Sequence, residues 1–209
     1  GQMRLEIPSF KDGATIPGEF AFGIPDPAEH VALSSNLNPH VKWSDLPADT
    51  RSLALLCHDP DVPSVPDDVN TEGRTVPADL PRVDFTHWVL VDVDPTLGEI
   101  PAGADSDAVT PQGKPGGATG YGVRGRNDYT GWFSGDTVMG GVYHGYDGPC
   151  PPWNDERIHH YVFTLYALDC DSLPLGGDFG RPEVLSAMDG HILAQAEWTG
   201  TYTLNPDLT

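Results

Sequence analysis

The chain has 209 residues, of which 24 are Gly and 21 are Pro, and its formal net charge is −20. Such a charge repels the phosphate backbone of nucleic acids and anionic membrane surfaces, so neither is an expected partner. The length suits one domain, expected to span residues 1–209, and Gly and Pro scattered between short apolar runs predict a mainly β fold with many turns.

The first half of the chain predicts two central strands. The apolar run SLALLC (52–57) has the length of a buried strand and ends in His58-Asp59-Pro60-Asp61, where a rigid DPDVP corner is expected. Residues 64–83 are polar and without periodicity, which predicts a long surface loop. The β-branched and aromatic run FTHWVLVDV (85–93) predicts the second strand, with His87 at its beginning.

The second half predicts a folded loop region, a third central strand and a helix. Residues 98–149 hold much of the glycine but are too aromatic for a free linker. HHYVFTLYALD (159–169) predicts the third strand. Apolar residues at helical spacing predict a helix over 182–197, where Gly190 costs about 1 kcal/mol relative to Ala, and residues 198–204 predict a last strand.

Cysteine usage and the N-terminus favour a reducing compartment. Cys57, Cys150 and Cys170 match no CxxC metal or redox motif, and an odd number argues against a secreted disulfide framework. The first residues lack the apolar stretch of a signal peptide, and no apolar run reaches the roughly 18 residues of a membrane span. We therefore expect a cytoplasmic protein without stable membrane insertion.

Several separated segments resemble one family. DPDVP (59–63), FTHWVL (85–90), and GPCPPW (148–153) followed by HHYVFTLYALD resemble the signature segments of phosphatidylethanolamine-binding proteins, closest to the bacterial and archaeal branch also called Raf-kinase-inhibitor-like. FKDGATIP, NPHVKWSDLP and AMDGHILAQAEWTGTY resemble bacterial members too, so the likeness covers nearly the whole chain. It implies an antiparallel β-sandwich with a C-terminal helix, long loops and a small pocket at one end.

The resemblance also implies which residues form that pocket. By position they are Asp59, Pro63, His87, Gly148, Pro151, His159 and Tyr161. We add Asp61, a second acidic residue at the end of the same strand, and Cys150, a candidate for a thiol beside the ligand. Family members bind phosphate-like or carboxylate anions in this pocket, and some regulate partner kinases or proteases.

The residue types suit an oxyanion, with one exception. Imidazole N–H, Tyr O–H and backbone N–H groups, including those of Gly148 and Cys150, are the donors that an oxyanion needs. Asp59 is the exception, because like charges about 4 Å apart repel by about 4 kcal/mol at an effective dielectric of about 20. Two explanations stay open: Asp59 orients His87 or His159 and keeps it protonated, or it pairs with an ammonium-bearing head group such as ethanolamine.

Two departures from the family pattern bear on the ligand. His160 stands where the family commonly has Arg, which replaces a fixed cation by a group mostly neutral at pH 7. Strand alternation turns His160 to the face opposite His159 and Tyr161. Residues 130–145 form a longer stretch than in compact bacterial members, and five aromatic residues in and beside it suit a pocket rim or an interface: Tyr129, Trp132, Phe133, Tyr143 and Tyr146.

We expect a binding protein rather than an enzyme, because no G-x-S-x-G elbow, HExxH motif or paired-Cys spacing occurs. The expected ligand is a small anion: phosphate, carboxylate or a phosphoethanolamine-like head group. No catalytic residue, resident metal or cofactor is expected. Two alternatives stay open. One is a regulator that docks a kinase or protease through loops 64–83 and 130–145, and the other is a metal-dependent hydrolase that uses Asp59, Asp61, His87 and His159. A homodimer would also fit the resemblance.

Overall fold

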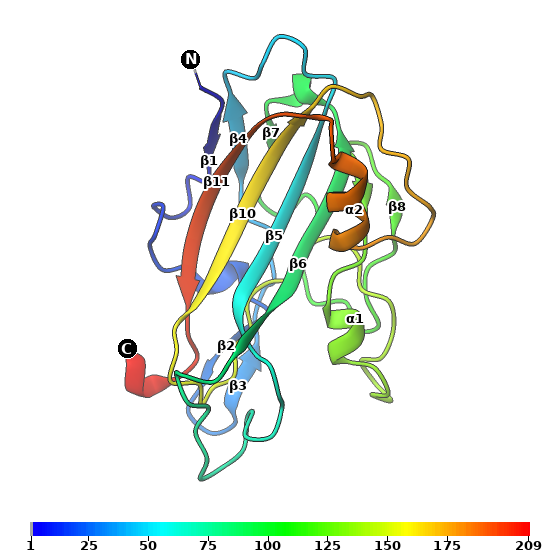
Figure 1. Cartoon of the computed structure of the whole chain (residues 1–209). Helices are drawn as coiled ribbons and strands as arrows, with labels where there is room; N and C mark the ends of the chain where they lie inside the picture. The colour runs from blue at the N-terminus through cyan, green and yellow to red at the C-terminus, as the bar shows by residue number, and fades with distance from the viewer. Residues whose placement is uncertain (1) are drawn as a thin grey trace.

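A long antiparallel sheet organises the fold (Figure 1). The computed structural model describes residues 2–209. The sheet has the strand order β11-β10-β5-β6-β9-β8. Its strands are β5 (Ser52–Pro63), β6 (Arg82–Val93), β8 (Gly117–Ala118), β9 (Val123–Arg124), β10 (His159–Leu168) and β11 (Ile192–Tyr202). The expectation of a mainly β, antiparallel fold is therefore confirmed.

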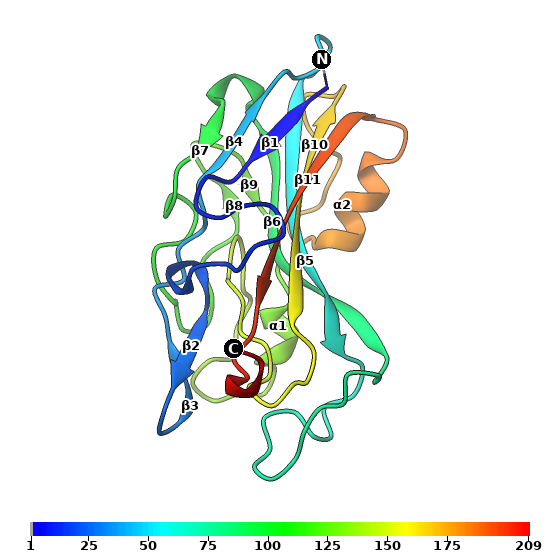
Figure 2. The same ribbon diagram turned by 90° about the vertical axis from the view of Figure 1, so that its left-hand side faces the viewer.

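Smaller sheets complete the sandwich. A three-stranded sheet has the order β1-β4-β7, and a hairpin pairs β2 with β3. Figure 2 shows the large sheet between helix α2 on one side and the β1-β4-β7 sheet on the other. The bounds are β1 (Arg4–Glu6), β2 (Gly23–Asp26), β3 (His30–Leu33), β4 (Val41–Ser44) and β7 (Glu99–Ile100).

Strand alternation divides the buried residues of β5 between two cores. Leu53 and Leu55 face the main core, which also holds Trp88 and Phe163. Leu56, one residue further along, faces the smaller core under α2. Because successive side chains of a strand point to opposite faces, the continuous apolar run 52–57 is what a sheet covered on both sides requires.

The helices are few and short. They are α1 (Tyr129–Trp132), α2 (Arg181–Met188) and three turns of 3₁₀ helix at Gly18–Phe20, Pro95–Leu97 and Pro206–Leu208. Within residues 2–209, none has the length and apolar character that crossing a bilayer demands.

The predicted helix over 182–197 is wrong in its second half. Helix α2 ends at Met188, and Gly190 follows with φ of +82°. A left-handed glycine just after a helix is a common C-terminal stop, so Gly190 ends the helix instead of lying within it. The chain then turns into β11, which pairs with β10 along its whole length. The predicted last strand therefore begins at Ile192.

Two further boundaries differ from the expectation. The predicted DPDVP corner belongs to β5, which continues to Pro63 through a register irregularity between Asp59 and Val62. Strand β6 begins at Arg82, so His87 lies in its middle and not at its beginning. The loop of residues 64–81 therefore connects the end of β5 to the start of β6 at the end of the sheet where β10 begins.

Candidate ligand-binding site

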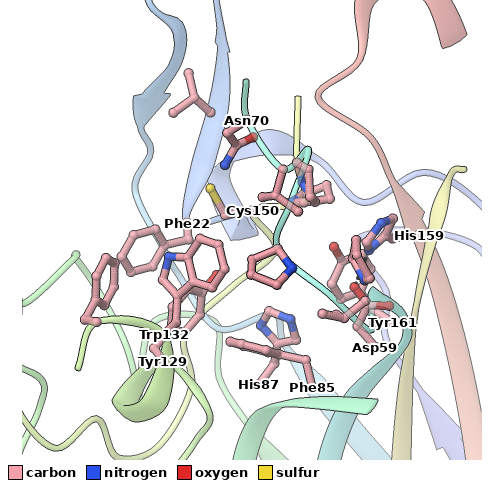
Figure 3. A pocket seen from close by; sticks show the side chains of 18 of the residues that line it. Phe22, Asp59, Asn70, Phe85, His87, Tyr129, Trp132, Cys150, His159 and Tyr161 are labelled. Carbon is pink, nitrogen blue, oxygen red and sulfur yellow. Dashed lines mark hydrogen bonds and ion pairs between the residues drawn. The ribbon is translucent and has the colours of Figure 1, made fainter. Parts of the chain in front are cut away.

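A cavity of about 420 Å³ opens where β5 ends and β10 begins. Seven parts of the chain line it: residues in and near the β2–β3 hairpin, the three strands β5, β6 and β10, the loop 64–81, residues 129–133, and the loop 150–152. Figure 3 shows Asp59, Tyr161 and His159 on one side, and Phe22, Tyr129 and Trp132 on the other. His87 lies between these groups. The cavity thus has a polar side and an aromatic side.

The structure brings seven of the nine predicted residues to this cavity. They are Asp59, Pro63, His87, Cys150, Pro151, His159 and Tyr161. Asp61 and Gly148 do not line it, and these two placements correct the sequence-based set.

Asp61 points away from the cavity because of the irregularity in β5. In a regular strand, residues i and i+2 share a face, but here Asp59 and Val62 line the cavity instead. The Asp61 carboxylate accepts hydrogen bonds from the backbone N–H and the ring Nδ1 of His160, both at 2.8 Å. Burial alone would raise the pKa of Asp61, but these hydrogen bonds lower it. His160 is exposed on the outer face, as alternation predicts.

Gly148 supports the cavity from behind. Its N–H donates to Asn36 Oδ1 over 2.7 Å, and its carbonyl accepts the Tyr129 hydroxyl at 2.5 Å. The expectation that its amide would serve a ligand is therefore wrong. A Cβ at this position would lie 2.2 Å from the carbonyl oxygen of Phe20, so only glycine allows the two backbones to come this close.

A buried ionic network forms the polar side of the cavity. His159 lies between two carboxylates, with Nδ1 2.5 Å from Asp59 Oδ2 and Nε2 2.7 Å from Asp155 Oδ2. Burial opposes the charge on His159, yet the bonds to Asp155 and Asp59 outweigh it and raise its pKa to about 9. Arg82 donates to both oxygens of Asp155 at 2.6 and 3.1 Å. Two cations therefore balance two anions, and Asp59 keeps His159 protonated, the first of the two explanations considered for it.

His87 and Tyr161 carry the polar atoms that this network leaves free. His87 Nδ1 lies 2.8 Å from the carbonyl oxygen of Asp147, and burial lowers the pKa of this imidazole. The His87 and Tyr161 rings meet edge to face, with centroids 5.1 Å apart. The Tyr161 hydroxyl is buried and has no hydrogen-bond partner among residues 2–209. Such a group costs roughly 1–3 kcal/mol unless something satisfies it.

The loop 64–81 is a structured wall, which the sequence reasoning missed. Asn154 holds it from beneath: its Nδ2 donates to the carbonyls of Asp68 and Arg74 at 2.7 and 3.0 Å. Its Oδ1 accepts from the Asn70 N–H at 3.0 Å. The one available signal was Asn154 beside the GPCPPW motif, because a buried Asn commonly fixes a loop backbone.

The aromatic residues of 129–146 are mostly buried, and only one is a rim residue. Tyr129, Tyr143 and Tyr146 are at most 4% exposed, whereas Trp132 is 52% exposed. Phe133 lines the cavity beside Trp132. The stretch therefore supplies a wall and one rim residue of the cavity rather than a broad exposed aromatic surface.

The residues proposed for a hydrolytic metal do not form a metal-ligand set. Within residues 2–209, one group of three or more His, Cys, Asp or Glu side chains has ligand atoms close enough to hold an ion: Asp169, Cys170 and His191. It follows the far end of β10, about 30 Å along the strand from His159 at 3.3 Å per residue. At the cavity, both nitrogens of His159 are bonded and Asp61 faces away.

Comparisons with known sequences find relatives that match nearly the whole chain. The sequence model described as "Phosphatidylethanolamine-binding protein" matches residues 6–203. The UPF0098 protein of Methanothermobacter thermautotrophicus is 30% identical over 200 residues, which cover 96% of this chain and 98% of that protein. The UPF0098 protein of Chlamydia pneumoniae is 31% identical, with 88% and 93% covered.

Solved structures show the same fold. CT736 from Chlamydia trachomatis, a homologue of the phosphatidylethanolamine-binding proteins, has a TM-score of 0.65 at 28% identity, with 96% of this chain and 97% of that chain covered. YbcL from E. coli, described as a new member of the mammalian PEBP family, has a TM-score of 0.67 at 23% identity, with 97% and 99% covered.

The His159 network predicts how stability depends on pH. The folded pKa of about 9 lies above the unfolded value, so this contribution is complete below about pH 6.5 and is lost as pH rises through 9. From pH 6.5 to 8.5 the loss amounts to roughly 2 kcal/mol. Urea unfolding of the wild type and of His159→Gln at both pH values should show this difference between their profiles. Parallel profiles would contradict a protonated His159.

Gly148→Ala should destabilise the fold although no ligand contact is changed. The added methyl group meets the Phe20 carbonyl, and overpacking of this kind costs about 1–3 kcal/mol. Gly177→Ala is the matched control, since its Cβ meets nothing within 4 Å; its effect should stay within about 0.5 kcal/mol. Equal urea midpoints for the two variants would refute the close approach.

Proposed function

The chain belongs to the phosphatidylethanolamine-binding protein family, and we propose that it binds a small ligand with an oxyanion head, phosphate or carboxylate, attached to an apolar group. One observation carries the proposal: Tyr161 lines the cavity beside His87, and its buried hydroxyl has no hydrogen-bond partner within residues 2–209. An oxyanion that accepts from this hydroxyl removes the cost of the unmade hydrogen bond.

The rest of the cavity suits an apolar group on the same ligand. Most of its other lining side chains are aliphatic, aromatic or Pro: Phe22, Val31, Leu33, Val62, Val65, Pro66, Val69, Phe85, Trp132, Phe133 and Pro152. Burying apolar ligand surface here contributes roughly 25 cal/mol per Å². A phospholipid head group with the first carbons of its chains has this combination, and so does a small phosphate or carboxylate ester.

We propose binding without catalysis, because the cavity holds no activated nucleophile among its described residues. Burial raises the pKa of the Cys150 thiol to about 12, which leaves almost no thiolate at neutral pH. Asp59 and His159 bond to each other and to further protein groups, so neither is poised as a general base. The predicted cytoplasmic location and homodimer stay predictions.

An exposed apolar rim favours a protein partner as the second candidate function. Leu33, Val65 and Trp132 lie at the cavity and are 61%, 44% and 52% exposed. A partner could insert an apolar side chain between them, as at the centre of many interfaces. Trp132→Ala would then abolish partner capture, while Tyr161→Phe would leave capture unchanged.

Tyr161→Phe should separate binding from stability. The variant removes a buried hydroxyl that has no partner, so the free energy of unfolding should stay the same or rise. Methyl phosphate, acetate and O-phosphoethanolamine are the probes for calorimetric titration. A hydrogen bond to a charged ligand contributes about 1.5–3 kcal/mol. Its loss in Tyr161→Phe should therefore raise the dissociation constant roughly 10 to 100 times.

Tyr146→Phe is the matched control for this experiment. Its hydroxyl donates to the Phe20 carbonyl at 2.5 Å, and Tyr146 does not line the cavity. This variant should lose about 1 kcal/mol of stability and keep its affinity. If wild-type protein binds none of the three probes, the proposed function is wrong; if Tyr161→Phe binds them as tightly as wild type, the hydroxyl is not the anchor.

A further inference from the structure

His87 presents a hydrogen-bond acceptor to the cavity. Its Nδ1 lies 2.8 Å from the Asp147 carbonyl oxygen, and since a carbonyl can only accept, Nδ1 carries the proton. The Asp147 N–H returns a hydrogen bond to the His87 carbonyl over 3.0 Å. In the neutral ring the lone pair is then on Nε2, which has no hydrogen-bond partner among residues 2–209.

The carbonyl that fixes this tautomer is itself held in place. The Asp147 carboxylate accepts hydrogen bonds from Lys114 Nζ at 3.0 Å, Asn36 Nδ2 at 2.8 Å and Asn127 Nδ2 at 2.9 Å. Because Asp147 is anchored through both its backbone and its side chain, the His87 ring cannot exchange its proton between the nitrogens without breaking this arrangement. Nε2 therefore remains the acceptor.

No uncompensated cation lines the cavity within residues 2–209. Its ionisable lining residues are Asp59, His87, His159, Cys150, Tyr129 and Tyr161. The charge of His159 is matched within the network with Asp59, Asp155 and Arg82. The titratable groups that act on His87 are Asp59 of β5, Asp128 and Asp147 of the neighbouring loops, and His58, with the neutral rings of Tyr129 and Tyr161 edge-on.

A fully deprotonated oxyanion is therefore a poor match for the polar groups that line the cavity. Its lone pairs would meet the lone pair of His87 Nε2 and the carboxylate of Asp59, while Tyr161 offers a single donor. One proton between an oxygen of the ligand and Nε2 turns this repulsion into a short charge-assisted hydrogen bond. The same complex forms whether the proton is drawn on the ligand oxygen or on the imidazole.

We propose, on the basis of the proposed function, that the site takes oxyacids together with one proton, shared between the ligand and His87 Nε2. The ligand class is then a phosphate monoester bound as its monoanion, or a carboxylic acid bound with its proton. Phosphate monoesters have a second pKa of about 6, so at neutral pH or above the bound form differs from the dominant free form.

Proton uptake measured on the wild-type protein tests this directly. Methyl phosphate is titrated by calorimetry at pH 6.0, 7.5 and 8.5, in two buffers with different ionisation enthalpies at each pH. We expect uptake of about one proton per ligand at pH 7.5, and a dissociation constant that rises about tenfold per pH unit above pH 7. Methyl sulfate, which has the charge of the monoanion but no titratable proton, is the matched probe.

Each outcome has a distinct meaning. If binding of methyl sulfate is also accompanied by proton uptake, the proton is on the imidazole. If only binding of methyl phosphate is, the proton is on the ligand. Both results support the proposal. In His87→Gln the amide can turn a permanent donor to the ligand, so uptake and pH dependence should disappear. A pH-independent affinity without proton uptake overturns the proposal but leaves the proposed function standing. Absence of binding by every probe at every pH overturns both.

Discussion

The buried imidazolium of His159 is the interaction on which the rest of the site depends. It joins the start of β10 to Asp59 at the end of β5 and to Asp155, which in turn holds Arg82 at the start of β6. Breaking a buried pair by removing one partner typically costs 3–5 kcal/mol, because the other charge is left uncompensated. The network thereby joins three central strands at the place where the cavity opens.

The charged groups of this network pair with one another, and this determines which polar atoms are left to contact a ligand. Asp59 and His159 bind each other, so the polar atoms that have no partner among residues 2–209 beside the largely apolar wall include the Tyr161 hydroxyl and His87 Nε2. From the sequence alone, by contrast, Asp59, His87 and His159 were all candidates for direct contact with a ligand. A site with few polar atoms selects through the protonation state and shape of its ligand, since each unmatched polar atom is costly in an apolar surrounding.

The central strands could be predicted from local pattern, whereas the seven of the nine predicted residues that line the cavity came mainly from the resemblance to the family. Apolar runs such as 52–57 and 159–169 leave few alternatives to buried strands. The orientation of Asp61 could not be predicted, because one irregularity in β5 reverses the face and is stabilised by a partner 99 residues away, His160. The predicted extent of the helix was wrong for a related reason. Residues 192–197 have the apolar spacing of a helix, but they form a strand because they pair with β10 and because the left-handed Gly190 ends the helix before them.

The net charge of −20 and the hydrogen-bonding groups of the cavity both bear on the protonation state of an anionic ligand. The surface field lowers the local concentration of anions and slows their approach, whereas a basic protein would speed it. Under the proposed function, contacts inside the cavity therefore supply the affinity. A protonated oxyacid carries less charge through this field than its dianion and also supplies the donor that His87 Nε2 lacks. The outer field and the inner hydrogen-bond pattern thus favour the same form of the ligand.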